Sequence, residues 1–448
     1  MGAIPKTLYR VHFRLLDLLG WGQRRFTGTG LALLAGLFVV GLAGLDPDLS
    51  ASYQAFSVLL CLLLVALCFT GAFPASFKVR RQLPAFGTAG CPIKYRVVVR
   101  NLTAKKQEGL TLLENLVEAR PGFQEWWAFQ VAEQRLLRSF RVSHRRRGDP
   151  FKTATVKPVA LPSALPHQET EAQVEVTPLR RGVLRFTGVV LARPDPLGLV
   201  RTCQIHPLAQ SILVLPKRYA LPAIALPGTM KYQQGGVALA ASVGQSDEFV
   251  ALRDYRNGDP YRHIHWRSWA KAGKPVVKEF EDEFFVRHGL VLDTFADHPH
   301  SEAFEEAVSV AASFVCTIQT QESLLDLLFV GPHSYCFTAG RGLGHAEQML
   351  ELLASVRTCH DHPFRALEHL VLTHVGSLSG CICVLVAWEA ERQRLVEKLL
   401  RLGVPALVLV IVEPGAETAL DPGPLRDKAE WFHVLEAGKV EEGLRRLG

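Results

Sequence analysis

The stretch from Asp247 to Glu283 gathers side chains that could do chemistry. His263 and His265 are two residues apart, so on a strand both would point to one face. Asp259 could add an oxygen ligand, and the three residues together would suit a metal-dependent hydrolase. Asp254 and Asp259 could instead act as an acid–base pair, although nothing in their spacing fixes the distance between the two carboxylates.

A third interpretation, which the residues favour, is structural. The arginines of the segment could form bidentate ion pairs with its carboxylates, Arg253, Arg262 and Arg267 with Glu248, Asp254 or Asp259. Tyr255 and Trp266 could lie across an apolar surface with their polar tips anchored. Because neither a nucleophile nor a full ligand set can be identified, we expect no catalytic residue and no enzyme activity. The segment would fix one domain against another or present a rigid face to a partner.

The composition limits which elements can position this segment. A chain of 448 residues is too long for one ordinary core, and 48% hydrophobic residues is high for a wholly soluble protein. The net charge of +7 is mild for this length and argues against nucleic acid as a partner. The nine cysteines are scattered, with no disulfide or zinc spacing, which favours a reducing compartment.

Two uncharged runs near the amino terminus predict a transmembrane hairpin, residues 24–77, with spans at about 27–45 and 51–73. Basic residues flank the pair, and only Asp46 and Asp48 lie in the short turn, so the positive-inside rule places both ends of the chain in the cytoplasm. We therefore expect a multi-pass membrane protein with the lipid bilayer as a partner. Residues 1–23 predict a basic amphipathic helix lying at the membrane surface.

The remaining chain predicts two further folded domains around the charged segment. Residues 78–215 contain alternating runs such as "IKYRVVVRNL", typical of a β-sandwich, although "EQRLLRSFRV" could be a helix or a strand. Residues 216–285 hold the charged segment. Residues 286–448 alternate apolar strands with helices, which predicts a doubly wound, Rossmann-type α/β domain.

Asp293 stands at the predicted end of the first strand of this α/β domain, where such sheets bind ligands. Its position resembles the start of the metal motif of the von Willebrand factor A fold, Asp-x-Ser-x-Ser. Here Phe295 and Asp297 replace the two serines, and Phe295 offers no oxygen ligand. We expect no bound cofactor, with Mg²⁺ at Asp293 as the one candidate metal.

The charged segment also resembles the signature of the domain-of-unknown-function 58 family (DUF58), whose members are membrane-anchored. The matching residues are Glu248, Phe249, Leu252, Arg253, Tyr255, Gly258, Asp259, Arg262, Ile264, Trp266, Ala270, Lys278, Glu279 and Phe280. The resemblance extends to the Arg-Arg-Gly start and the Asp-Pro-x-Gly turn of "RRGVLRFTGVVLARPDPLGLVR".

This resemblance implies a von Willebrand A-like carboxy-terminal domain and genetic pairing with a MoxR-type AAA+ ATPase, but no known reaction. We therefore expect a membrane-anchored multidomain scaffold or adaptor of the bacterial inner membrane, acting with that ATPase or another membrane protein in cell-envelope or complex-assembly processes. The alternative is a metal-dependent hydrolase that uses residues 247–283 or Asp293.

Overall fold

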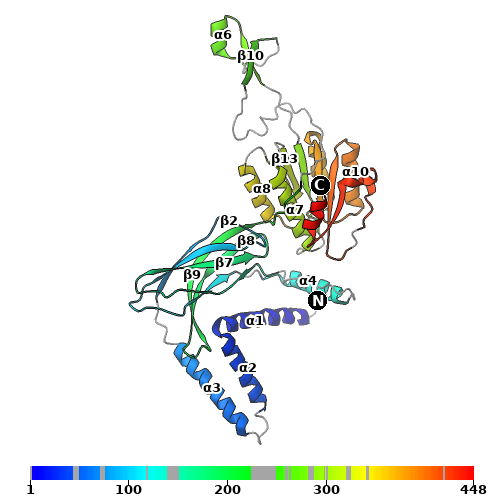
Figure 1. Ribbon diagram of the computed structural model, residues 1–448. Helices are drawn as coiled ribbons and strands as arrows, with labels where there is room; N and C mark the ends of the chain where they lie inside the picture. Colours follow the sequence, from blue (N-terminus) through cyan, green and yellow to red (C-terminus); the bar gives the residue numbers. More distant parts are fainter. Residues whose placement is uncertain are drawn as a thin grey trace. The chain divides into compact units, whose positions relative to one another are not determined.

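The computed structural model describes the following residues: 3–43, 50–70, 76–117, 120–138, 151–222, 249–257, 261, 264–280, 287–296, 298, 301–318, 324–339, 343–416 and 419–447. The chain divides into two compact units, Met1–Leu215 and Pro216–Gly448. Figure 1 shows the elements of both.

Three helices begin the first unit: α1 (Ala3–Arg25), α2 (Gly28–Ala43) and α3 (Ser50–Thr70). The apolar helices α2 and α3 lie side by side (Figure 1), and Gly41 lets the ring of Phe56 approach within 3.5 Å of where a Cβ would stand. Among the described residues one stretch, Ser52–Thr70, is long and apolar enough to cross a membrane, whereas Gly28–Leu42 is apolar but shorter. The helix Ser52–Thr70 corresponds to the predicted span at 51–73, and the predicted span at 27–45 therefore stays a prediction.

The rest of the first unit is a pair of sheets packed face to face. One sheet has the strand order β1 (Phe77–Gln82), β3 (Ile93–Asn101), β7 (Glu169–Pro178), β5 (Ala154–Val156). The other has the order β2 (Phe86–Thr88), β9 (Arg201–Leu215), β8 (Gly182–Pro194), β4 (Thr111–Leu116), β6 (Val159–Ala160). Strand β3 buries every second residue, as its alternation predicts. A helix, α4 (Phe123–Arg138), follows β4 and decides the ambiguous run in favour of helix as far as Arg138.

The turn between β8 and β9 docks onto the apolar helices. Asp195 organises this turn, because its Oδ1 accepts the backbone N–H groups of Leu199 and Val200, each at 2.7 Å. The start of α2 then bonds to the turn: the Thr27 hydroxyl donates to the Gly198 carbonyl at 2.5 Å, and the Thr27 N–H to the Leu199 carbonyl at 3.1 Å. The Asp-Pro-x-Gly turn is thus a joint between the sandwich and α2.

Gly30 makes that joint possible, and its substitution gives a first prediction. A Cβ at Gly30 would lie 2.0 Å from the Leu199 carbonyl oxygen, a backbone atom that cannot move aside alone. Gly30→Ala is expected to cost about 1–3 kcal/mol of stability through this overpacking. Thermal unfolding of the full chain in detergent measures the loss. Gly36→Ala is the matched control, because its nearest neighbour is a flexible Leu59 methyl at 3.8 Å. Equal unfolding midpoints for the two variants would contradict the docking role.

The second unit contains a six-stranded sheet. Its order is β14 (Ser334–Ala339), β13 (Leu324–Val330), β12 (Arg287–Leu292), β15 (Gly380–Leu385), β16 (Ala406–Val412), β17 (Phe432–Glu436). All neighbours pair in parallel except β13 and β14. Strands β12, β13 and β15 are buried along their whole length, as apolar runs predict. The chain order runs outward in both directions from β12 and β15, so the topological switch point lies between these two strands.

Helices α7 (Glu302–Ile318), α8 (Leu343–Ser355), α9 (Arg365–His374), α10 (Ala390–Arg401) and α11 (Val440–Leu444) connect or follow these strands, with 3₁₀ turns at Val375–Ser377, Gly423–Trp431 and Arg445–Leu447. The mostly parallel α/β architecture is therefore as predicted. In this α/β domain, the antiparallel edge strand β14 and the helix α9 were not predicted from the sequence.

A separate small motif precedes the sheet. Strands β10 (Phe249–Asp254) and β11 (Val276–Phe280) pair antiparallel, and α6 (Trp266–Ala272) lies between them in the chain. Residues 249–280 are called the hairpin module below.

Candidate functional site

Stacked aromatic side chains dominate the hairpin module. Trp266 and Trp269 lie three residues apart on α6, with ring centroids 5.2 Å apart and planes 19° apart. Tyr255 and Tyr261 form a second stacked pair at 6.2 Å. Trp266 is 66% exposed and Tyr261 is 76% exposed, and α6 buries none of its residues. Large exposed aromatics of this kind are enriched at protein interfaces.

Basic side chains lie beside these rings. Arg267 and Lys271 are exposed on α6 and stand four residues apart, so they share one face of the helix. Lys274 pairs with the Asp254 carboxylate at 2.6 Å, and the Arg253 guanidinium donates to the Asp254 main-chain carbonyl at 3.2 Å. Sequence reasoning assigned Asp254 an arginine partner and missed Lys274. The hairpin module thus exposes basic side chains and aromatic rings, which are groups suited to binding a partner.

The other predicted residues of this segment have different outcomes. Ile264 is buried and forms a bridge with Val277. His265 stands just before α6, and its Nδ1 lies 2.7 Å from the Ser268 hydroxyl. This hydrogen bond joins the His265 side chain to the first turn of the helix. Phe249 begins β10. The remaining predicted residues lie outside the described ones: Glu248, Gly258, Asp259, Arg262 and His263.

Asp293 occupies the switch point of the six-stranded sheet, directly after β12. It is fully buried, and both of its carboxylate oxygens are hydrogen-bonded. Oδ1 accepts the Phe295 N–H at 2.9 Å, while Oδ2 accepts the Val386 N–H at 3.3 Å and the Arg392 Nε–H at 3.1 Å. Burial raises the pKa of Asp293, and the Arg392 guanidinium and the two backbone N–H groups act in the opposite direction.

Arg392 supplies the positive charge at this edge. Besides Asp293 it donates to the Phe295 carbonyl at 3.0 Å and to Glu389 at 3.3 Å, and its guanidinium lies 4.7 Å from the centroid of the Phe364 ring. A magnesium ion on Asp293 would have to displace this guanidinium. Among the described residues, no group of three or more His, Cys, Asp or Glu side chains could hold a metal. The residues present do not fit the predicted Mg²⁺.

Sequence reasoning found Asp293 and missed Arg392, although a signal was present. Arg392 falls on the same helical face as Leu395, Val396 and Leu399, which are the other buried residues of α10. A charged residue on the apolar face of an amphipathic helix requires a buried partner of opposite charge.

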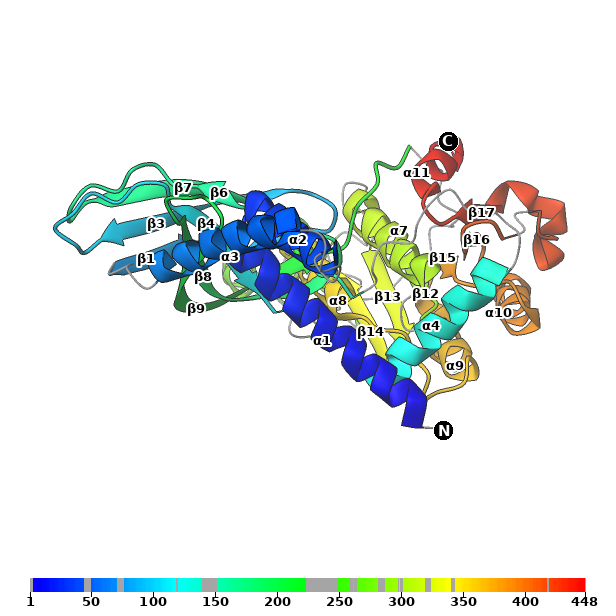
Figure 2. The same cartoon turned by 90° about the horizontal axis from the view of Figure 1, so that it is seen from below.

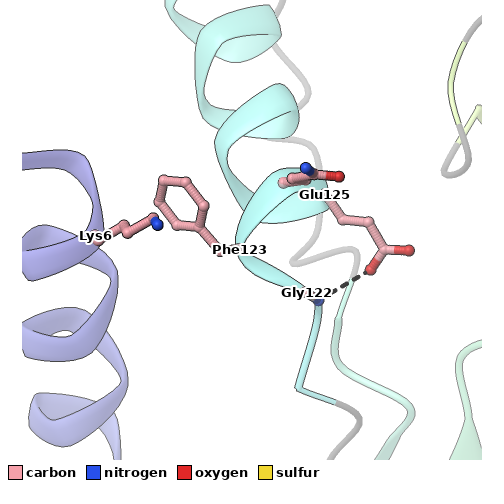
Figure 3. Close-up of a pocket in the computed structure, with 5 residues that line it drawn as sticks. Lys6, Gly122, Phe123 and Glu125 are labelled. Atoms are coloured by element: carbon pink, nitrogen blue, oxygen red, sulfur yellow. Dashed lines mark hydrogen bonds between the residues drawn. The ribbon is translucent and has the colours of Figure 1, made fainter. Parts of the chain in front are cut away.

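An open hollow of about 640 Å³ lies between the starts of α1 and α4 (Figure 3). Its lining consists of Lys6, Gly122, Phe123, Gln124 and Glu125. Glu125 accepts the Gly122 N–H at 3.1 Å and so caps the first turn of α4. This lining offers one amine and one carboxylate already in use, so the hollow lacks the paired groups of an acid–base site.

His288 on β12 gives a pH prediction. It is 4% exposed, its Nδ1 lacks a hydrogen-bond partner in the described part of the chain, and burial lowers its pKa from 6.5 to about 4. The fold therefore holds His288 neutral, whereas the unfolded chain takes up a proton below pH 6.5. Stability is fully present above pH 6.5 and is lost as pH falls toward 4, by about 3 kcal/mol in total.

The variant His288→Leu is expected to lose this part of the pH dependence. Chemical denaturation of the full chain at a series of pH values measures it, and His360→Asn, at an exposed position, is the control. A variant whose stability falls as steeply as that of the wild type between pH 6.5 and 4 would assign the effect to another group.

Comparisons with known proteins complete this description. Residues 251–372, from β10 to α9, match the family model described as "Protein of unknown function DUF58", which confirms the predicted resemblance for this part of the chain. A Bacillus subtilis (strain 168) protein described as "Uncharacterized protein YeaD" is 28% identical over 184 residues, which is 40% of this chain and 44% of that protein. The match thus spans less than half of the relative's length.

Solved structures show only faint likeness. The CARDB domain of a Pyrococcus furiosus protein, in complex with di-metal ions, has 12% identity and a TM-score of 0.18 over 32% of this chain and 89% of its own. A cohesin module from a Clostridium perfringens family 33 glycoside hydrolase has 9% identity and a TM-score of 0.16 over 31% of this chain and 97% of its own.

Proposed function

We propose that this chain is a non-catalytic, membrane-anchored scaffold whose hairpin module binds a protein partner. The observation that carries the proposal is the exposed ring of Trp266, which stacks on the half-buried ring of Trp269 on a helix that buries no residue. Exposing the large indole ring of Trp266 to water is unfavourable, and the binding of a partner would offset that cost. The nearby Arg267 and Lys271 favour a partner whose contacting surface is acidic.

Membrane anchoring is the second part of the proposal. The apolar stretch Ser52–Thr70 supports one span, and α2 beside it would supply a second, with both ends of the chain in the cytoplasm at the inner membrane. The sheet order and the antiparallel edge strand β14 support a von Willebrand A-like α/β domain. The DUF58 resemblance suggests a MoxR-type AAA+ ATPase as the partner.

The Arg392 guanidinium supports the scaffold over the alternative of a metal-dependent hydrolase. A hydrolytic metal needs open coordination positions and a nearby base. At the switch point, Asp293 is bonded on both oxygens by protein groups. In the hairpin module, His265 is engaged by Ser268 and Asp254 by Lys274.

Affinity purification tests the partner directly. The full chain is expressed in its native host, solubilised in mild detergent and purified by a tag, and bound AAA+ ATPase is quantified. Trp266→Ala is expected to reduce the recovered ATPase at least about tenfold, as for an aromatic hot spot. The unfolding midpoint should stay that of the wild type, because Trp266 is exposed.

Leu402→Ala is the matched control, since Leu402 is a large exposed side chain of the same unit outside the module. It should recover the ATPase at the wild-type level. Equal recovery with Trp266→Ala would remove the hairpin module from the interface. Wild-type chain that enriches no AAA+ ATPase would remove the proposed partner.

A further inference from the structure

Helix α1 has an inner face that is held by the first unit. The Tyr9 hydroxyl donates to the Pro121 carbonyl at 2.8 Å, and the Tyr9 ring lies 5.5 Å from Trp126 and 5.8 Å from Phe123, both on α4. About two helical turns after Tyr9, Asp17 forms an ion pair with Arg120 at 2.7 Å. These contacts fix which side of α1 faces the protein.

The outer face of α1 is apolar and exposed. The side chains that recur there at helical spacing are between 51% and 63% exposed: Leu8, Val11, Leu15, Leu18 and Leu19. They lie roughly opposite Tyr9 and Asp17 on the helix, because successive residues are about 100° apart. An apolar stripe of this length on a soluble surface would be costly, so a neighbour of low polarity should cover it.

The charges beside that stripe are basic. Arg10 and Arg14 are exposed on α1. Arg14 lies at the edge of the apolar face, about 40° from Leu18 on the helix, whereas Arg10 lies on the side of Asp17. The single acidic residue of α1, Asp17, is neutralised by Arg120. An apolar face flanked by arginine is the pattern of a helix that lies in the surface of an anionic bilayer.

The placement of α1 fits the same surface. Two residues, Phe26 and Thr27, separate α1 from the apolar helix α2. In Figure 1, α1 meets α2 at the upper end of that helix and extends away from α3, with α4 on the side of α1 away from α2 and α3. Figure 2 shows α1 and α4 from the side of α2 and α3. The apolar face of α1, opposite α4, therefore looks toward the same side as the apolar helices.

We propose that α1 and α4 form a lipid-binding collar, in which α4 holds the inner face of α1 and the outer face lies among the headgroups and upper acyl chains of an anionic bilayer. The inference rests on the proposed membrane anchoring and adds the surface, its orientation and its lipid class. The collar places the Arg14 guanidinium, at the edge of the apolar face, beside the lipid phosphates.

Photocrosslinking in nanodiscs of phosphatidylglycerol and phosphatidylethanolamine tests the collar. A benzophenone amino acid replaces Leu15 on the outer face or, as the matched control, Phe13 on the inner face. The Leu15 position is expected to give several-fold more phospholipid adduct than the Phe13 position. The variant Arg14→Glu should reduce the phosphatidylglycerol adduct and leave the phosphatidylethanolamine adduct nearly unchanged.

Three results would overturn the collar. They are equal lipid adducts at the two positions, a Leu15 adduct to a second copy of the chain, and a charge-reversed variant with unchanged phosphatidylglycerol adduct. Retention of the chain in carbonate-washed membranes is measured in parallel. Loss of retention would count against the membrane anchor itself, whereas retention without a Leu15 lipid adduct would count against the collar alone.

Discussion

Replacing Arg392 with alanine is expected to lower the free energy of unfolding of the second unit by about 3–5 kcal/mol. The change leaves the Asp293 carboxylate fully buried without its cation and removes a guanidinium that also fixes the Phe295 carbonyl. Chemical denaturation of the full chain in detergent measures the loss. Arg394→Ala is the matched control, because Arg394 lies on the same helix and its ion pair is exposed.

The loss should depend on pH in a defined direction. Burial already raises the pKa of Asp293, and removing Arg392 takes away the largest opposing influence. The variant's raised pKa gives stability that is present at acid pH and is lost as pH rises through the folded pKa. The deficit should therefore be larger at about pH 8 than at about pH 5.

The same measurement checks the metal prediction for Asp293. Millimolar magnesium should leave the wild-type unfolding midpoint unchanged, because protein groups already bond both carboxylate oxygens. A magnesium-dependent rise in the wild type would restore the metal site and refute the role given to Arg392.

The second large effect is expected in the sandwich, on replacing Glu114 with alanine. Arg81 and Glu114 have fully buried side chains and form a bidentate pair at 3.1 and 2.5 Å. Arg81 also donates to the carbonyls of Leu208 and Gly188, and it lies 4.6 Å from the Phe186 ring centroid. Without Glu114 the buried Arg81 guanidinium has no anionic partner, so we expect the free energy of unfolding to fall by about 3–5 kcal/mol.

Two comparisons separate this pair from ordinary surface charge. Glu175→Ala, which removes an exposed partner of Lys94, should cost less than about 1 kcal/mol. The double variant Arg81→Met, Glu114→Leu should regain much of the stability lost in Glu114→Ala, because no charge is then left unpaired. A double variant less stable than Glu114→Ala would show that the pair is needed for more than charge balance.

Much of the fold follows from local pattern. Strand β3 alternates and buries alternate residues, and β12 and β15 are apolar throughout and are buried throughout. Such signals are short-range, because the pattern of apolar residues within one strand indicates whether one or both of its faces are buried. Strand β14 was not predicted because it is an edge strand whose residues are mostly exposed or half-buried. Its sequence therefore lacks a clear alternation of apolar and polar residues.

The candidate sites were only partly predictable for a different reason. Asp293 could be located because a carboxylate follows an apolar strand. Its partner Arg392 lies 99 positions later in the chain, and no local pattern joins the two. The same holds for Lys274, which reaches Asp254 only after β10 and β11 pair. The Trp266–Trp269 stack, in contrast, follows from helical spacing once α6 is recognised.

The joint between Thr27 and the turn at Gly198 has a mechanical consequence. Strands β8 and β9 extend from this turn through the sheet, so a displacement of the turn would be transmitted along both strands to the sandwich. Any tilt of α2 must move this turn as well or break the hydrogen bonds to the Gly198 and Leu199 carbonyls. A change in the tilt of α2 would therefore rotate the strands of the sandwich.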